Sequence, residues 1–373
     1  MTRSVPALPP PLTPRAFRCR CGRPVFFRNS ECLACHTPLG YDPATRRLWP
    51  LEPAAAAGQW KRAGLRRGRP WWRCANLDSP AACNWLVDVS DLHAGTPSLC
   101  RCCRLTRTLP DLSQPENALR WGRIAAAQRR LVSTLLGLQL PVCAKTSEDP
   151  VRGLAFDLLR AAPGGPAICT GHHDGVITLD VDEADDPTRE QRRDALHEPY
   201  RTLLGHLRHE TGHYYWQRLV DGSAWLEPFR ALFGDERSDY AAALQRHHAQ
   251  GPPADWGERH VSAYASSHPW EDWAETWAHY LHLVDTLDTA RSFGLDGERV
   301  ELSYERFDPE ILADSGDAEP LAFLALVNGW MELTGVLNEL SRSMGVPDFY
   351  PFVLSRAALR KLHLVHRVIG APR

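Results

Sequence analysis

Nine of the 11 cysteines in this chain of 373 residues lie within its first 103 residues, and several of them occur in close pairs. The first cluster, CRCGRPVFFRNSECLACHTPLGY, contains Cys19 and Cys21 as C-x-C and Cys32 and Cys35 as C-x-x-C. Two close pairs joined by a short hairpin-like loop can bring four thiolates into tetrahedral geometry around one zinc ion. We therefore expect these four cysteines to form one structural zinc site.

A second cluster lies in the segments CANLDSPAACNWLV and LCRCCRL. Cys74 and Cys83 are expected to supply one half of a second zinc site, and Cys100 and Cys103 the other half. We exclude Cys102 because the C-x-x-C spacing of Cys100 and Cys103 suits a zinc knuckle better. Disulfides are the alternative, but they are rare in a reducing cytoplasm. Buried free cysteines would not fall into paired spacings.

Residues 18–110 are therefore expected to form a zinc-ribbon module, which folds around its metal ions because it has little core of its own. The module combines arginines with nearby tryptophans: Arg20, Arg23, Arg28, Arg66, Arg67, Arg69, Trp60, Trp71 and Trp72. Such a surface suits nucleic acid, and a basic ribbon suits an acidic protein surface equally well. We expect a nucleic-acid or protein partner, and the sequence leaves that choice open.

The charge of the chain is divided unevenly along its length. Residues 1–130 carry 21 Lys and Arg against 8 Asp and Glu, whereas the remainder carries 22 against 37. This asymmetry predicts two modules with different roles. The Pro-rich start lacks the apolar core of a secretory signal, and we expect residues 1–17 to be a disordered tail. Because no apolar run approaches about 20 residues, we expect a cytoplasmic protein without membrane contact.

Residues 111–373 are predicted to form a mostly helical domain with a small sheet, which makes the whole chain an α+β protein. Helical spacing of apolar residues is found at 117–138, 149–162, 319–344 and 355–369. The one clear strand is GVITLDV at 175–181, with β-branched residues and alternation.

A further helix is expected to begin near Pro199 and to include GHLRHETGHYYW, which contains the pattern H-E-x-x-H. His209 and His213 are four residues apart, so both imidazoles project from one helix face, as two zinc ligands require. Glu210 lies beside them and is placed to reach a zinc-bound water rather than the metal. Because short patterns also occur by chance on solvated helices, a third ligand is needed to identify this pattern as a metal site.

The segment HPWEDWAETWAHYLH, residues 268–282, offers that ligand on a helix that begins at Pro269. Glu271 and Glu275 are four residues apart and share one face. A capping acid with a salt bridge is the alternative, but two carboxylates on a Trp- and Ala-rich helix favour a metal site. Composition does not separate Glu271 from Glu275 as the ligand. Metzincins are excluded because Leu219 occupies the position of their third histidine.

The segment VSAYASSHPWEDWAETWAHY resembles the third-ligand segment of lethal-factor-type gluzincins. In those proteins a tyrosine precedes the zinc glutamate by seven residues and a second glutamate follows it by four. The resemblance implies that Glu271 is the ligand, Tyr264 the transition-state donor and Glu275 an acid that supports the ligands.

The chain beyond residue 17 is also similar to bacterial zinc-binding metallopeptidases with N-terminal zinc ribbons. The similarity rests on CANLDSPAACNWLV, LCRCCRLTRTLPDL, HLRHETGHYYW and HPWEDWAETWAHYLH. It implies a zincin-like fold for residues 111–373.

Together these features predict a zinc-dependent peptidase with one catalytic and two structural zinc ions. Glu210 would act as general base toward water, and the Tyr264 hydroxyl would stabilise the oxyanion. The alternative is a non-enzymatic protein whose ribbons bind nucleic acid or protein and whose zincin-like domain is a scaffold. An intact Glu210 favours the peptidase, because a scaffold has no use for a general base.

Overall fold

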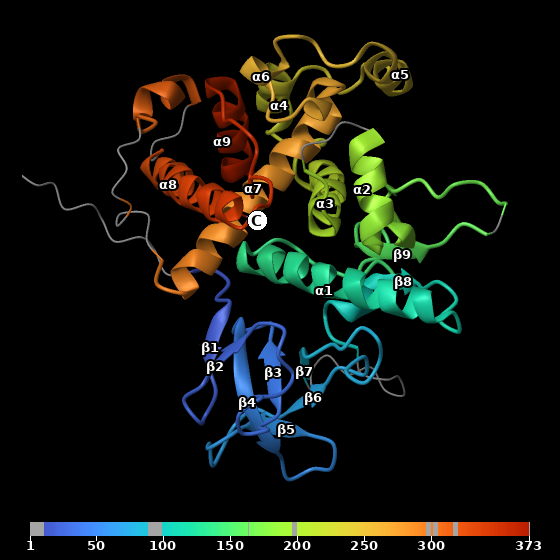
Figure 1. Cartoon of the computed structure of the whole chain (residues 1–373), viewed down its shortest axis with the longest axis vertical. Helices are drawn as coiled ribbons and strands as arrows, with labels where there is room; N and C mark the ends of the chain where they lie inside the picture. Colours follow the sequence, from blue (N-terminus) through green and yellow to red (C-terminus); the bar gives the residue numbers. More distant parts are fainter. Residues whose placement is uncertain are drawn as a thin grey trace, which may run out of the picture. The chain divides into compact units, whose positions relative to one another are not determined.

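The computed structural model describes residues 11–88, 99–162, 164–195, 200–295, 300, 305–315 and 320–372 (Figure 1). It contains two compact units: Pro14–Tyr214 form one, and Met1–Thr13 together with Tyr215–Arg373 form the other. The division falls inside helix α3, which is continuous over Leu203–Leu219. Ribbon strands are followed by a mostly helical region with a small sheet, so the predicted α+β class is confirmed.

The cysteine-rich region consists of short antiparallel strands. Strands β1 (Ala16–Arg18) and β2 (Pro24–Phe26) form a hairpin. Five more form a sheet in sequence order: β3 (Leu39–Asp42), β4 (Arg47–Pro53), β5 (Trp60–Arg62), β6 (Trp71–Arg73) and β7 (Leu86–Asp88). Strands this short offer few side chains for a core.

One hydrophobic cluster of the cysteine-rich region lies on this five-stranded sheet. Leu51, Trp71 and Leu86 are buried together, and Trp49 and Trp60 pack against them. The packing is close, since a Cβ added to Gly40 would lie 2.4 Å from the Leu86 side chain. Because the strands are short and eight cysteines converge in two groups between them, we expect the fold of the ribbon to depend on metal.

A second sheet has four strands in the order β10-β11-β9-β8. Their bounds are Thr106–Thr108 for β8, Ala155–Leu159 for β9, Gly171–His173 for β10 and Val176–Asp180 for β11. Strand β9 pairs in parallel with β8 and β11, whereas β10 and β11 form an antiparallel hairpin. Asp174 and Gly175 close that hairpin with positive φ, as a two-residue turn requires.

Strand β9 corrects the prediction of a helix over residues 149–162. The segment Ala155–Phe156–Asp157–Leu158 is buried between two neighbouring strands, so its apolar run does not alternate. Short continuous apolar runs fit a buried parallel strand as well as a helix. Strand β11 confirms the strand predicted at 175–181.

Three helices accompany this sheet in the sequence: α1 (Pro115–Gly137), α2 (Asp186–Ala195) and the start of α3. Helix α3 begins at Leu203, later than predicted, and Pro199 lies outside the described residues. The hydroxyl of Thr202 accepts a hydrogen bond from the backbone N–H of Gly205 at 3.0 Å. Thr202 therefore caps the helix that carries the two histidines.

The other unit is helical: α4 (Leu226–Phe233), α5 (Tyr240–Gln250), α6 (Trp256–Arg259), α7 (Pro269–Ser292), α8 (Leu321–Ser343) and α9 (Arg356–Gly370). Helix α7 contacts α4, α8 and α9. Trp273 and Trp277 on α7 are fully buried, as is Trp330 on α8. A helix buried on most sides has little amphipathic character, which explains the Trp- and Ala-rich sequence of α7.

Helix α8 is, among the described residues, the single helix whose length and composition would also suit a membrane span. A core helix of a folded domain meets the same criterion. Phe323, Val327 and Trp330 of α8 are buried, and the helix contacts α7. These contacts account for its apolar sequence.

The expectation of a disordered tail over residues 1–17 is wrong for residues 11–17. The backbone N–H groups of Leu12 and Thr13 donate to the carboxylate of Asp288 at 3.1 and 2.9 Å. The buried guanidinium of Arg15 donates to the Ser133 hydroxyl at 2.6 Å, and β1 begins at Ala16. Buried polar groups need such partners, and they order this segment. Residues 1–10 lie outside the described part of the chain.

Candidate metal centres

The sulfur atoms of the first cysteine cluster converge. The four Sγ atoms of Cys19, Cys21, Cys32 and Cys35 lie within 4.8 Å of one another. Tight turns follow each pair, because the backbone N–H of Gly22 donates to the Cys19 carbonyl and that of His36 to the Cys32 carbonyl. These turns aim both thiols of a pair at one point.

The electrostatics of this cluster favour a cation. A hydrogen bond from the Thr37 hydroxyl lowers the pKa of Cys35 to about 6, whereas burial raises the pKa of Cys19 to about 11. Neighbouring thiols therefore do not all ionise together unless a positive charge lies between them. Four converging thiols are the donor set of a closed zinc site.

The second cluster is formed by Cys74, Cys83, Cys100 and Cys103, whose Sγ atoms also lie within 4.8 Å of one another. The backbone N–H of Cys100 donates to the Cys74 sulfur, and that of Cys103 donates to the Cys100 sulfur, both at 3.4 Å. Hydrogen bonds from Cys100 and Cys103 hold the pKa of Cys74 far below its usual range. Both clusters contain the sets of residues that the sequence predicted.

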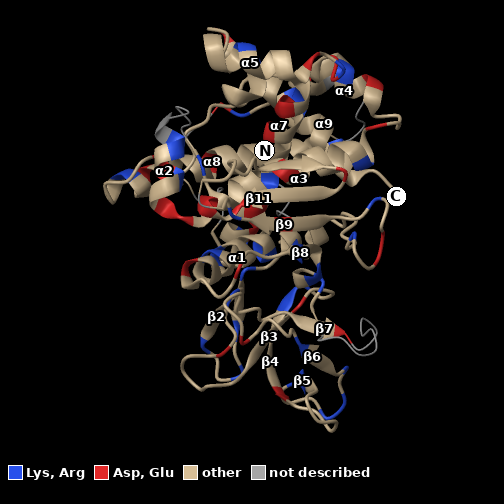
Figure 2. Cartoon of the chain, turned by 90° about the vertical axis from the view of Figure 1, so that its right-hand side faces the viewer, with Lys and Arg blue, Asp and Glu red and all other residues tan. Residues whose placement is uncertain are grey.

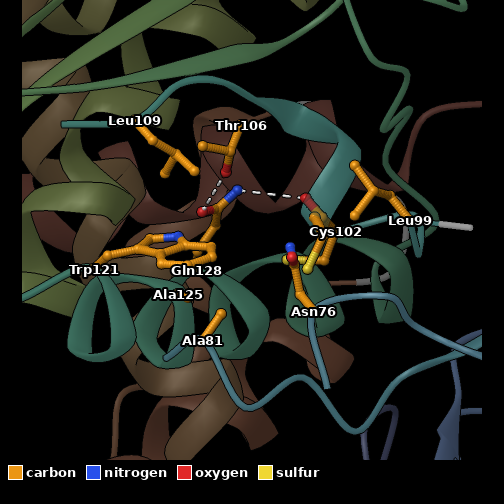
Figure 3. A pocket seen from close by; sticks show the side chains of 10 residues that line it. Asn76, Ala81, Leu99, Cys102, Thr106, Leu109, Trp121, Ala125 and Gln128 are labelled. Carbon is orange, nitrogen blue, oxygen red and sulfur yellow. Dashed lines mark hydrogen bonds between the residues drawn. The ribbon is translucent and has the colours of Figure 1, made fainter. Parts of the chain in front are cut away.

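Cys102 lies outside this sulfur group. It lines a cavity of about 130 Å³ together with Asn76, Trp121 and Gln128 (Figure 3). The amide of Gln128 donates to the Cys102 backbone carbonyl at 3.4 Å and accepts from the Thr106 hydroxyl at 3.2 Å. Burial raises the pKa of the Cys102 thiol, which keeps it neutral. Because the pKa values of Cys83 and Cys100 within the sulfur group are raised as well, it is the position of the Cys102 sulfur that sets it apart from the group.

Helix α3 presents the two histidines of the H-E-x-x-H pattern side by side. The Nε2 atoms of His209 and His213 are 3.2 Å apart. His213 and Glu210 are buried, and Thr211 between them donates its hydroxyl to the Leu207 carbonyl at 3.0 Å. One metal ion can therefore be reached by both imidazoles.

His172 on β10 is a neighbour of His213 that the sequence analysis missed. Desolvation by burial lowers the pKa of His172 to about 4, and the proximity of His213 adds to the effect. Its Nε2 accepts a hydrogen bond from the Gly175 backbone N–H at 3.0 Å. Its place in the segment GHHDG gave no spacing signal toward His213, which lies 41 residues further along the chain.

Glu271, in the first turn of α7, completes a third group. Glu271 as a residue is 1% exposed. A ligand oxygen of Glu271 and ligand nitrogens of His209 and His213 lie within 4.8 Å of one another. Two imidazoles and one carboxylate fit a zinc ion that keeps a fourth position for water or substrate. The Tyr240 hydroxyl donates to Glu271 Oε1 at 2.6 Å, a contact that the sequence did not predict.

Tyr264 and Glu275 are linked to one short loop of the helical unit. Tyr264 begins the 3₁₀ turn η4 (Tyr264–Ser266), and its ring lies edge-on to His247, with centroids 5.9 Å apart. Glu275 Oε2 accepts a hydrogen bond from the Ser262 hydroxyl at 2.7 Å. Ser262 Oγ in turn accepts from the Ala265 backbone N–H at 3.1 Å. Glu275 therefore anchors the loop that carries Tyr264.

Other histidines near α7 have structural partners. His260 Nδ1 lies 3.1 Å from Asp272 Oδ2, and the Lys361 ammonium donates to the same oxygen at 2.5 Å. His279 Nδ1 lies 2.5 Å from the Tyr350 hydroxyl. Neither histidine belongs to a group of metal-ligand atoms among the described residues.

Comparison with known families decides the relationship. Residues 117–368 match the sequence profile of the family described as "Putative zinc-binding metallo-peptidase", which covers more than half of the chain. The chain belongs to this metallopeptidase family. Residues 16–114 match a zinc-ribbon domain profile. The resemblance to zinc-binding metallopeptidases with N-terminal zinc ribbons is therefore confirmed.

Three mycobacterial proteins are similar to this chain over nearly its whole length. Proteins of Mycobacterium bovis and of two Mycobacterium tuberculosis strains, each named as uncharacterized, are 42% identical to this chain over 357 residues. The alignment covers 95% of this chain and 95% of each relative. No solved structure matched the chain. Family membership and the cysteine clusters support zinc binding.

Proposed function

We propose that this chain is a cytoplasmic zinc peptidase of the gluzincin type, with a catalytic zinc held by His209, His213 and Glu271. The observation that carries the proposal is the proximity of the three ligand atoms, all within 4.8 Å of one another. Glu210 is the residue beside His209 and is buried, as expected for a general base.

The contacts of helix α3 with α7 support this ligand set. Tyr215 of α3 stacks on Trp277 of α7, with ring centroids 4.9 Å apart. Trp216 of α3 meets Trp270 of α7 edge-on at 6.4 Å. His213 precedes Tyr215 by two residues on the same helix, and Glu271 follows Trp270 directly. These contacts between α3 and α7 therefore favour one metal ion that is bound by both His213 and Glu271.

When bound, zinc would supply Lewis-acid chemistry and lower the pKa of a water molecule toward about 7. Glu210 would take a proton from that water and pass it to the leaving amine. The hydroxyl of Tyr264 would donate to the oxyanion that forms on the peptide carbonyl. Glu275, through Ser262, would hold the loop on which Tyr264 lies.

The two cysteine clusters would each hold one structural zinc ion, which makes three zinc ions per chain. Closed four-thiolate sites leave no position for substrate, so they contribute folding energy and no hydrolysis. Reduced thiols in such sites agree with a cytoplasmic location.

A second function is binding of nucleic acid or protein by the ribbon, without catalysis. Residues 14–88 carry 13 Lys and Arg against 5 Asp and Glu, and Figure 2 shows Lys and Arg (blue) along the ribbon strands and loops. The Arg62 guanidinium lies over the Trp49 ring at 4.0 Å. Strongly salt-dependent DNA binding by the full chain, together with inactivity toward peptides, would favour this function.

The deciding experiment compares the wild-type protein with Glu210→Gln. Each protein is incubated with an intact bacterial proteome, and the new N-termini are identified by mass spectrometry. Loss of the general base should reduce cleavage by about 10²–10⁴-fold. Glu227→Gln is the matched control, because Glu227 on α4 is 82% exposed and pairs with Arg230. New N-termini with wild type and the control, absent with Glu210→Gln, are expected. Equal cleavage by all three proteins would contradict the proposal.

A further inference from the structure

No sequence pattern predicted the contact between Tyr240 and Glu271. The Tyr240 phenol donates to Glu271 Oε1 at 2.6 Å, and Glu271 is almost fully buried. We propose that Tyr240 is a positioning residue that binds one oxygen of Glu271, so that the carboxylate ligates the metal through its other oxygen. This inference rests on the proposed zinc site.

The start of helix α5 fixes the Tyr240 ring. Asp239 caps the helix, because its Oδ1 accepts from the Ala242 backbone N–H at 3.0 Å. The Tyr240 ring meets the rings of His268 and Trp270 edge-on, with centroid distances of 5.2 and 6.0 Å. The phenol therefore approaches Glu271 from a defined direction.

His268 ties this segment to the first turn of α7. Its Nδ1 accepts a hydrogen bond from the Trp270 backbone N–H at 3.1 Å, so Nδ1 carries no proton. Its Nε2 must then carry the proton, and it lies 3.1 Å from the Ser238 carbonyl oxygen and 2.9 Å from the Ser238 hydroxyl. A neutral imidazole of one tautomer thus links Ser238 to the turn that carries Glu271.

Gly234 brings the connecting segment close to α7. Its φ of +102° is one that side chains rarely adopt, and a Cβ there would lie 3.2 Å from Pro269 Cγ. Pro269 is the first residue of α7. The chain between Gly234 and Tyr240 is therefore held at the same helix end by three separate contacts: Gly234 with Pro269, Ser238 with His268, and Tyr240 with Glu271.

The hydrogen bond has a direct consequence for a metal ligand. A short bond from a neutral donor to a carboxylate is charge-assisted and directional. It fixes the rotation of the carboxylate and disfavours chelation of the metal by both oxygens. Groups that orient ligands in this way typically change metal affinity by about 10–100-fold when removed.

The test uses the full chain loaded with cadmium-113 and observed by NMR. Cadmium bound by four thiolates resonates far from cadmium bound by nitrogen and oxygen, so the sites are distinguished. The resonance missing in a His209→Ala/His213→Ala variant reports the proposed catalytic site. Tyr240→Phe keeps the ring contacts and should shift that resonance while both thiolate resonances stay in place. Zinc affinity of that site, from chelator competition, should fall about 10–100-fold.

Tyr350→Phe is the matched control, because it removes a phenol hydrogen bond to His279 in the same unit. Replacing Tyr240 by 3-fluorotyrosine keeps the fold and strengthens the donor, and should move the resonance oppositely to Tyr240→Phe. An unchanged resonance and affinity in both Tyr240 variants would overturn this inference alone. Absence of the third resonance in wild type would overturn the proposed zinc site as well.

Discussion

The ribbon and the α3–α7 region offer a metal different ligands on different supports. In the ribbon, eight thiols lie on turns between short strands, beside buried side chains that include Leu51, Trp71 and Trp85. In the α3–α7 region, the proposed ligands lie on long helices, and helix α7 contains fully buried tryptophans. The metal is therefore expected to hold the ribbon together, whereas the helices exist without their metal.

The net charge of a zinc site would also differ between the two regions. Four thiolates around Zn²⁺ leave a formal charge of about −2 and no open position. Two neutral imidazoles and one carboxylate leave about +1 and a fourth position for water. A positive, incompletely ligated zinc polarises water and carbonyl groups, and a closed negative one does not. Only the second arrangement is suited to hydrolysis.

The largest expected effect comes from removing all metal. Structural zinc contributes about 10–16 kcal/mol of apparent binding free energy in zinc-finger peptides, which is also folding free energy. After chelation, residues 16–114 should become accessible to proteases, while far-UV circular dichroism retains most of its helical signal. A ribbon that resists proteases without metal would contradict the predicted difference in metal dependence between the ribbon and the helices.

The next prediction tests whether Glu271 or Glu275 is the zinc ligand. Glu271→Ala should empty the proposed catalytic site, because two histidines and water hold zinc poorly. Glu275→Ala removes the partner of Ser262 and should keep the metal at saturating zinc, with affinity or activity reduced about 10–100-fold. Zinc content of the two variants is the measurement. An empty site in Glu275→Ala and a full one in Glu271→Ala would reverse the assignment.

The smallest effect on metal content is expected for Tyr264→Phe. One hydrogen-bond donor to an oxyanion typically contributes about 10²–10³-fold to the rate. We expect hydrolysis to slow by roughly 100-fold, the lower end of this range. Metal content and stability should be unchanged, because Tyr264 is not a proposed ligand. Rates on a peptide found in the proteome search would show this. A full rate would remove Tyr264 from the mechanism.

Local spacing predicted much of the metal chemistry. C-x-x-C and H-E-x-x-H are short patterns whose geometry is set by one turn or one helix, so the grouped sulfurs and the paired histidines were accessible from sequence. Strand β9 was not, because Ala155–Leu159 is a strand only through pairing with residues about 20 and 50 positions away.

Contacts across long separations were also missed. Tyr240 reaches Glu271 from 31 residues away, through a loop held by Gly234 and His268. Thr13 binds Asp288 across 275 residues, which orders a segment whose composition suggested a tail. In both cases the partner is chosen by tertiary packing, and no local pattern encodes it.

The most direct test of the proposed catalytic zinc is metal content by elemental analysis of wild type and of the His209→Ala/His213→Ala variant, both purified without chelators. If the ribbon holds two closed sites and helices α3 and α7 a third, wild type should contain about three zinc ions per chain and the variant about two. Circular dichroism should be the same for both proteins. A wild-type value near one, or equal zinc in the two proteins, would contradict the account.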